Sequence, residues 1–275
     1  MANNRIFYAC QAIAIAKTGH SNTDSEFEVM KGVQSAGMSV NLTLDPVFEY
    51  GQSELYSNEE EIAEVEVTIE KVIDGEKLLY LQAVGNIGKT NLQGAAKSVC
   101  DVFLAIYADT TTSISGATPD HVVMCSGMTV SNISYKYQVD GNATESISLA
   151  GNNRFWDAVT AGIIGVTPAT AFDDGGSTAD AINGSDSPAS GIVRRGKFNL
   201  LGSTLPAEVV SQNAAVAGAS GIQSVSVSVD FSREDQKELG RFGPYNKTAS
   251  STLEVTSEFE VVATNGDLVS VSGYG

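Results

Sequence analysis

The chain has 275 residues, 33 of them acidic and 16 basic, which gives a formal net charge of -17. This length is enough for one large all-β domain, or two smaller ones, with a substantial buried core. A hydrophobic fraction of 42% with 18% charged residues is typical of a folded protein and excludes a globally disordered chain. Because DNA binding depends on Lys and Arg contacts to phosphates, a chain this acidic is not expected to bind nucleic acid. The acidity serves either solubility or a repulsive functional surface.

Few residues are suited to bind metal ions or to form disulfides. Cys10, Cys100 and Cys125 are odd in number and lie in apolar, strand-like runs, which predicts buried free thiols. His20 and His121 are the histidines of the chain, and no Cys/His cluster has the spacing of a zinc site. No metal and no cofactor is therefore expected.

The N-terminal residues raise the question of a signal peptide. Arg5 followed by an apolar run mimics one, but Tyr8 and Gln11 interrupt the run, and residues 6–15 read as a first strand. Nowhere does an apolar run approach the ~18 residues of a membrane span, so no membrane partner is expected.

Strand patterns recur along most of the chain. Residues 6–15 are apolar on both faces, which indicates a central strand. The run 99–107 is continuously apolar apart from Asp101 and predicts another buried strand. Alternating apolar and polar side chains predict strands with one buried face over 38–44, 64–70 and 133–139. Residues 198–201 and 268–271 predict two shorter strands.

The C-terminal part carries the clearest sequence of elements. Residues 224–231 alternate between valine or phenylalanine and polar side chains, and residues 253–261 do so with glutamate and threonine, so both predict strands. Between them Ser232 stands where a helix N-cap belongs, Asp235 follows three residues later, and Gly240 marks a stop, which predicts a helix over 232–239.

Helical periodicity is otherwise confined to residues 77–84, which predict a second short helix. Many strands, few helices and turn-rich joints indicate a mainly β fold, an antiparallel β-sandwich or barrel with one or two short helices. No internal repeat and no domain linker is evident, so residues 1–275 are predicted to form a single domain.

Two segments interrupt this pattern. Residues 45–76 hold eleven acidic side chains against a single Lys71, which predicts a long projecting hairpin or solvated loop. Residues 167–191 are rich in Gly, Ser, Ala, Thr and Asp with little to bury, which predicts a surface insertion.

One motif imitates a nucleotide site. Residues 83–90 fit a relaxed P-loop, with Thr90 in the place of the magnesium ligand and Asp109 ending an apolar run. A P-loop needs a preceding strand, a following helix and a parallel sheet, whereas Ala83 replaces the first glycine and the rest of the chain reads antiparallel. We therefore interpret the segment as a Gly-containing loop.

Other candidate chemistry is equally weak. The aspartates of the Gly/Ser-rich insertion, Asp173, Asp174, Asp180 and Asp186, lack the spacing of a calcium loop. Glu258 and Glu260 lie on a solvated strand face without a pocket. No Gly-x-Ser-x-Gly elbow is present for a catalytic triad. Trp156 is interpreted as a core or interface anchor. No catalytic constellation is found, and the chain is not expected to be an enzyme.

The C-terminal block, DFSREDQKELGRFGPY followed by LEVTSEFEVVATNGD, resembles the C-terminal part of tail tube proteins of long-tailed bacteriophages. Residues 32–75 resemble the early strand, long loop and hairpin of that family, and residues 97–116 its next strand, so that the likeness covers about half of the chain. Its most specific piece is the turn formed by Gly240, Arg241, Gly243, Pro244 and Tyr245; Phe242 departs from the polar residue expected there.

The resemblance implies a structural subunit of a virion. Hexameric rings would stack into a hollow tube that delivers viral double-stranded DNA, with sheet edges joined between copies. It also implies synthesis in the bacterial host cytoplasm, location in the phage tail, and tape-measure, terminator or baseplate proteins as partners, with a sheath protein if the tail contracts. Candidate residues for contacts between rings are Asp45, Pro46, Phe48, Tyr50, Leu55 and Tyr56.

A channel lined with carboxylates would offer DNA no basic contacts. Two acidic strand faces are candidates for that lining, and the sequence does not choose between them or exclude that both lie outside: Glu64, Glu66 and Glu70, or Glu254, Glu258 and Glu260. The alternative function is an acidic β-sandwich that acts as a binding module, such as a capsid decoration protein or an adhesin.

Overall fold

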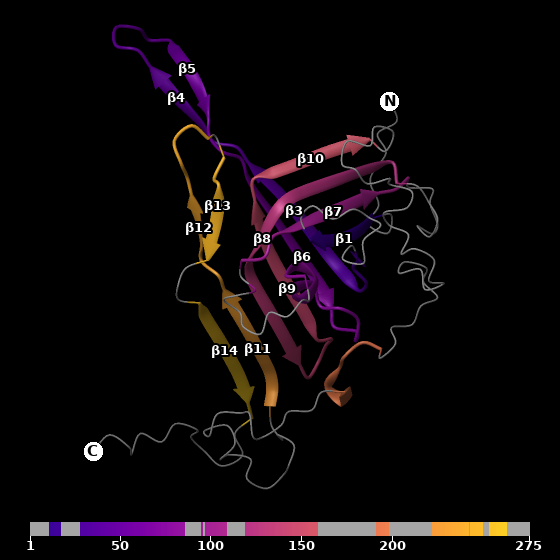
Figure 1. The fold of residues 1–275 in the computed structure, drawn as a ribbon. Helices are drawn as coiled ribbons and strands as arrows, with labels where there is room; N and C mark the ends of the chain where they lie inside the picture. Colours follow the sequence, from indigo (N-terminus) through magenta and orange to yellow (C-terminus); the bar gives the residue numbers. More distant parts are fainter. Residues whose placement is uncertain are drawn as a thin grey trace, which may run out of the picture.

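The structure is a computed structural model that describes residues 11–17, 28–85, 95, 97–108, 119–158, 191–197, 222–241, 243–249 and 253–262. These residues form a mainly antiparallel β fold (Figure 1). The elements are β1 (Gln11–Lys17), β2 (Glu28–Val29), β3 (Val33–Asn41), β4 (Leu44–Phe48), β5 (Leu55–Glu60), β6 (Glu64–Val72), α1 (Leu79–Ala83), β7 (Cys100–Ile106), β8 (His121–Gln138), β9 (Thr144–Gly151), β10 (Asn153–Ala158), the 3-10 turn η2 (Arg195–Lys197), β11 (Ile222–Asp230), β12 (Arg233–Gln236), β13 (Asn246–Ala249) and β14 (Glu254–Val261).

Ten of the described strands form one sheet, and the long strand β8 organises it. The first half of β8 pairs with β7 and β10, and its second half pairs with β9 and β11. Two half-sheets therefore share β8. We call β2, β1, β7, the first half of β8 and β10 the closed half-sheet, and β3, β6, β9, the second half of β8, β11 and β14 the open half-sheet.

Two irregularities in β8 curl the sheet. The pairing with β7 shifts at Gly127, which has a φ of 69°, and the amide of Gly127 donates to Asp101 Oδ1 at 2.9 Å. The pairing with β9 shifts again at Ser131, whose hydroxyl donates to the carbonyl of Ser148 at 3.0 Å. Bulges of this kind bend a strand and increase its twist, so the inner faces of the two half-sheets enclose one core.

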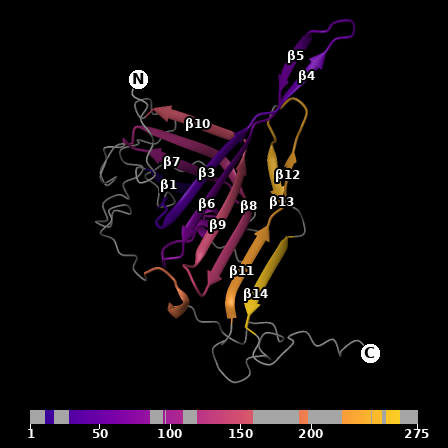
Figure 2. The ribbon, with the colours of Figure 1, turned by 180° about the vertical axis from the view of Figure 1, so that it is seen from behind.

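The core is apolar and lies between the half-sheets and helix α1. Helix α1 contacts β1, β8 and β9. Figures 1 and 2 show the two half-sheets, which share β8, from opposite sides. Strands β1 and β7 are buried on both faces, whereas β6 is buried on one face only. Fully buried members of the core include Ile15, Ile69, Leu79, Met128, Ile147, Leu149 and Phe231.

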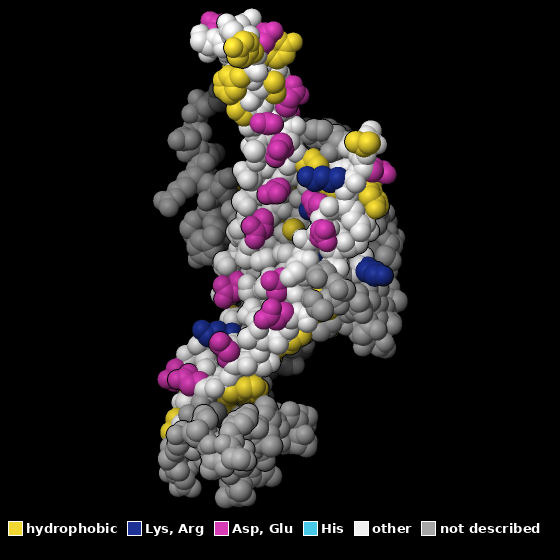
Figure 3. Space-filling view, turned by 90° about the vertical axis from the view of Figure 1, so that its left-hand side faces the viewer, with side chains coloured by type: hydrophobic (Ala, Val, Ile, Leu, Met, Phe, Trp, Pro, Cys, Tyr) yellow, Lys and Arg dark blue, Asp and Glu magenta, His cyan; other side chains and the backbone are white. Residues whose placement is uncertain are grey.

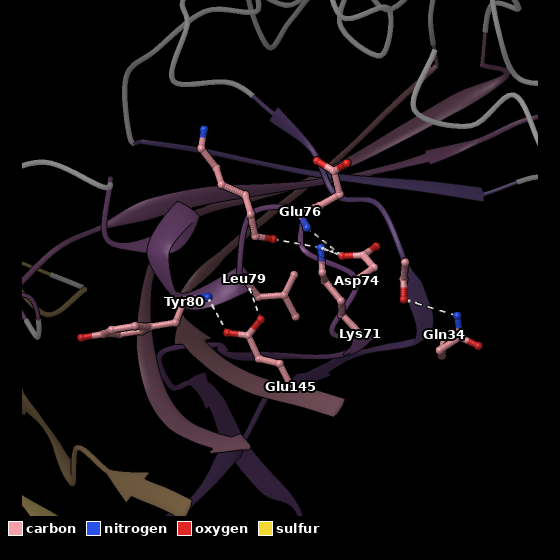
Figure 4. A network of polar contacts seen from close by, with 9 residues as sticks. Gln34, Lys71, Asp74, Glu76, Leu79, Tyr80 and Glu145 are labelled. Atoms are coloured by element: carbon pink, nitrogen blue, oxygen red, sulfur yellow. Dashed lines mark hydrogen bonds and ion pairs between the residues drawn. The ribbon is translucent and has the colours of Figure 1, made fainter. Parts of the chain in front are cut away.

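A buried polar network ties the helix to the sheet (Figure 4). Glu145 of β9 is fully buried and accepts hydrogen bonds from the amides of Leu79 and Tyr80, at 2.7 and 3.1 Å. The hydroxyl of Tyr135 donates to the same carboxylate at 3.0 Å. Beside it the buried Lys71 ammonium lies 3.2 Å from Asp74 Oδ1, so these charges are paired and not isolated in the core.

Most sequence-predicted elements are confirmed. Strands are present within or across 64–70, 99–107, 133–139, 224–231 and 253–261, and α1 lies within the predicted helix 77–84. The predicted strand 38–44 spans the end of β3 and the start of β4. Strand β1 covers the end of the predicted strand 6–15; residues 6–10, 198–201 and 268–271 lie outside the described residues.

The predicted helix over 232–239 is wrong. Ser232 has a φ of 41° and its amide donates to Asp230 Oδ1 at 2.8 Å, so the apparent N-cap is a tight turn. Strand β12 follows and pairs with β13. Arg233 Nε donates to the carbonyl of Val130 at 2.7 Å, which draws the chain against β8. The segment lacks an apolar stripe that would stabilise a helix, so these tertiary contacts determine its strand conformation.

The projecting segment is shorter than the predicted interval 45–76. Strands β4 and β5 form a separate two-stranded hairpin that extends beyond the main sheet (Figure 1), whereas residues 64–72 form β6 inside the open half-sheet. We call residues 44–60 the projecting hairpin. The predicted insertion 167–191 lies outside the described residues except for Gly191.

Candidate assembly surfaces

The open half-sheet has one polar face that crosses all six of its strands. Side chains directly opposite each other on paired strands point to the same side of a sheet, so the strand registers place them in rows. One row runs Ser35, Glu70, Ser146, Ser134, Ser228, Thr256. The next row runs Gly37, Thr68, Ser148, Asn132, Asp230, Glu254.

These rows bring both predicted acidic sets onto the same face. Glu66 lies beside Thr68 and Glu70 on the outward side of β6, and Glu258 lies two residues from Thr256 on the outward side of β14. The sequence alone leaves the two sets as alternatives, because it does not give the order of the strands in the sheet. The exposed glutamates of this face are Glu64, Glu66, Glu70, Glu254, Glu258 and Glu260.

Serine hydroxyls contact several of these glutamates. Ser224 Oγ donates to Glu260 Oε2 at 2.9 Å, and Ser226 Oγ lies 3.4 Å from Glu258 Oε2. At the other side of the face, Ser35 Oγ lies 3.5 Å from Glu70 Oε2. Small hydroxyl side chains therefore lie next to both acidic strands of this face, β6 and β14.

Positive charge is scarce on this polar face. Among the outward positions of these six strands, as far as the structure describes them, Lys136 is the one basic side chain. The acidic side chains there are the six glutamates and Asp230. Figure 3 shows acidic side chains in series from the projecting hairpin towards the lower end of the molecule, with few Lys and Arg side chains among them. A polyanion would be repelled by such a surface.

Two strands of the open half-sheet have an unpaired edge. In the described part of the chain, β3 pairs with β6 alone and β14 with β11 alone. The side opposite to the polar face is apolar there and incompletely covered: Val40 of β3 is 39% exposed and Val255 of β14 is 51% exposed. Open edges with apolar side chains favour pairing with another chain.

The projecting hairpin carries the candidate residues for contacts between rings. Phe48 and Tyr56 are each 67% exposed, and Tyr50 and Leu55 are exposed as well. Asp45 and Pro46 are exposed on the same hairpin. Hydrophobic side chains gather at the end of the hairpin in Figure 3. Such exposed apolar side chains on a projection are typical of a contact surface.

The turn that carries the family resemblance lies between β12 and β13. Gly240 has a φ of 86°, a conformation that favours glycine, and Arg241 is exposed with its guanidinium 3.9 Å from Glu238. The turn borders a groove of about 400 Å³ next to the bend of β8. Phe242 lies outside the described residues. The groove is lined in part by Arg241, Gly243, Pro244, Tyr245 and Gly127.

Trp156 is not a core residue. Its side chain is 57% exposed on the edge strand β10 and packs against His121, with ring centroids 5.9 Å apart. The prediction of a core anchor is therefore wrong, and an interface anchor stays a prediction. The prediction of buried free thiols is confirmed for Cys100 and Cys125; Cys10 lies outside the described residues.

The described residues offer little for binding chemistry. Within them no three His, Cys, Asp or Glu side chains are grouped so as to hold a metal ion. Helix α1, not a strand, precedes Gly85, which is contrary to a P-loop. The insertion aspartates lie outside the described part of the chain. No described helix has the length and apolar character that crossing a membrane requires.

Burial raises the pKa values of several core side chains. The pKa of the Tyr135 hydroxyl is raised by burial and by the adjacent Glu145 carboxylate. Burial raises the pKa of Tyr107 to about 12 and that of Cys125 to about 11. These groups stay neutral at physiological pH, as buried side chains of the core do.

Among the solved structures similar in fold to this chain are a prophage cap, an injection-system complex and Hcp1. The cap of the anti-feeding prophage has 12% identity and a TM-score of 0.37, covering 57% of this chain and 94% of its own. The sheath-tube complex of an extracellular contractile injection system, PVC, has 12% identity and a TM-score of 0.38, covering 57% and 95%. Hcp1 from Salmonella typhimurium has 13% identity and a TM-score of 0.30, covering 55% and 88%.

No protein-family model matches the chain, and no curated protein sequence does. The TM-scores of these three structures are 0.38 or lower, so the likeness carries no argument about function.

Proposed function

We propose that this protein is the structural subunit of a phage tail tube, in which rings of six copies stack around a channel for double-stranded DNA. The observation that carries the proposal is the polar face of the open half-sheet, which gathers all six candidate glutamates between two open edges. The number of copies comes from the resemblance of residues 32–112 and 220–267 to tail tube proteins.

The chemistry of the polar face suits a channel wall. DNA carries one negative charge per ~1.7 Å of helix axis, and a protein holds it mainly through Lys and Arg. A wall of glutamates and serines with a lone Lys136 supplies almost no such contacts. DNA would then pass through a ring without adhering to it.

The edges suit closure into a ring. In a ring, one surface of each copy meets a different surface of the next copy. The open half-sheet has two different open edges, β3 and β14, at its opposite sides. Joining edges would turn separate sheets into a continuous wall and cover the apolar side chains beneath them.

The projecting hairpin suits contacts between rings. Its exposed apolar side chains, with Phe48 and Tyr56 foremost, extend beyond the main sheet and would reach a neighbouring ring. The turn of Gly240, Arg241, Gly243, Pro244 and Tyr245 belongs to the same proposed family pattern. We infer a place in the virion tail, with tape-measure, terminator or baseplate proteins, and a sheath if the tail contracts, as partners.

The test is the state of assembly of the pure protein. Negative-stain microscopy and sedimentation at increasing concentration should show rings or tubes with a hollow centre. Monomers at every concentration would overturn the proposal and favour the acidic binding module. Turnover of a substrate or nucleotide would also contradict it.

A further inference from the structure

The strand directions make the two open edges compatible. Every pairing from β3 through β6, β9, β8 and β11 to β14 is antiparallel. Five antiparallel steps leave β3 and β14 running in opposite directions. When a second copy is placed beside the first in the same orientation, its β3 can therefore continue the sheet from β14 with the same antiparallel pattern.

The charge pattern distinguishes this joint from one between identical edges. The outward positions of β14 are Glu254, Thr256, Glu258 and Glu260. Pairing β14 with β14 would place glutamates opposite glutamates, and like charges directly opposite destabilise a sheet. The outward positions of β3 are uncharged and small: Ser35, Gly37, Ser39 and Asn41.

The chain itself already uses this combination. Inside one copy, the serines of β11 contact the glutamates of β14, as Ser224 with Glu260 at 2.9 Å shows. On the other side, Ser35 of β3 contacts Glu70 of β6 at 3.5 Å. At both sides of the open half-sheet, a serine-bearing strand therefore lies next to a strand rich in glutamate.

We propose that β14 of one copy pairs with β3 of the next copy, so that the small polar side chains of β3 lie against the β14 glutamates. This inference rests on the proposed tube and names the surface through which its copies join. The apolar sides of both edges favour it, since Val40 and Met38 of β3 and Val255 and Phe259 of β14 share the core side of the sheet. Joining the edges would bury these side chains together.

Gly37 gives a sharp test of the charge pattern. It opposes the neutral Thr68 within its own chain, and a Cβ added to it meets no atom within 4 Å. Gly37→Glu should raise the concentration needed for ring assembly about fivefold or more, because it sets a carboxylate against the β14 glutamates. Gly37→Gln, of equal size and neutral, is the matched control. Adding Glu258→Lys to the Gly37→Glu chain should restore assembly.

Cysteine pairs test the geometry independently. Gly37→Cys combined with Glu254→Cys, Thr256→Cys or Glu258→Cys should give an oxidised ladder of linked copies at one of these outward positions. Gly37→Cys with Ser257→Cys, which points to the opposite face, should give none.

The outcomes separate the two proposals. A ladder with weakened assembly of Gly37→Glu supports the joint. Rings from the wild-type chain, with no ladder and equal assembly of Gly37→Glu and Gly37→Gln, would overturn the joint and leave the tube standing. A wild-type chain that forms no rings overturns both.

Discussion

Glu145 and Leu79 are joined across the core: the carboxylate Oε2 of Glu145 accepts a hydrogen bond from the Leu79 amide at 2.7 Å. Helix α1 has no capping side chain of its own at Leu78, so a carboxylate from β9 takes that place. The first amides of a helix otherwise lack partners, and a negative charge near them is stabilising. The contact makes the short helix dependent on the sheet.

Replacing this carboxylate should therefore destabilise the fold. Glu145→Ala leaves the amides of Leu79 and Tyr80 and the hydroxyl of Tyr135 without their acceptor. We expect the free energy of unfolding to fall by about 2–4 kcal/mol. Urea denaturation of the unassembled chain measures it. Glu66→Ala removes an exposed carboxylate from the neighbouring strand and should change stability by less than about 0.5 kcal/mol; an equal loss in both variants would contradict the capping role.

The turn before β3 provides a second prediction. Gly32 has a φ of 75°, and a Cβ built there would lie 2.6 Å from Asp74 Oδ2. Gly32→Ala should cost about 1–3 kcal/mol, since it strains the backbone and presses on the partner of the buried Lys71. Gly37→Ala, in open space on β3 and without a positive φ, is the control. Thermal unfolding of both variants, followed by circular dichroism, decides; similar melting temperatures would refute the prediction.

The sequence was sufficient to predict a strand where one face of that strand is buried and the other exposed. In β6 every second residue from Val65 to Ile69 is buried and the residues between are exposed, so the period of two in the sequence reflects the burial directly. It was also sufficient for β7, where a continuous apolar run lies buried on both faces.

The sequence failed where distant contacts decide. Residues 232–239 have the local marks of a capped helix, yet the contact of Arg233 with the carbonyl of Val130, some hundred residues earlier, fixes a strand. The polar face is a similar case. Its glutamates were found from alternation within single strands, but only the order of β3, β6, β9, β8, β11 and β14 shows that they share one surface.

Alkaline pH should destabilise the fold. Burial raises the pKa of Cys125 to about 11 and that of Tyr107 to about 12, above their ordinary values of 9.0 and 10.0. The unfolded chain therefore loses these protons first as the pH rises, so their contribution to stability is complete below pH 9 and is lost between about pH 9 and 12. Urea midpoints at increasing pH should fall through this window. A midpoint that rises or stays level there would contradict the assignment.

The projecting hairpin should matter for tubes and not for folding. Phe48→Ser with Tyr56→Ser replaces two largely exposed side chains, so the melting temperature of the single chain should stay within a few degrees. In the proposed tube the variant should still form rings but stack them poorly, with short or absent tubes in negative stain. Phe155→Ser, which alters an exposed aromatic side chain on β10 and keeps the predicted interface anchor Trp156, is the control and should give tubes of normal length. Tubes of normal length from the hairpin variant would exclude the hairpin from stacking.

The last prediction concerns the passage of DNA. Glu66 and Glu254 lie on β6 and β14, and both side chains point to the polar face. Changing both to lysine reverses two charges in every copy and adds basic contacts to the proposed channel wall, so DNA should be released more slowly from assembled particles. The rate, followed with a DNA-binding dye after triggered ejection, should recover at higher salt because salt screens phosphate contacts. Glu49→Lys with Glu54→Lys on the projecting hairpin makes the same change in net charge away from this face and should leave release unaffected. Equal rates for all three particles would mean that the polar face does not line the channel.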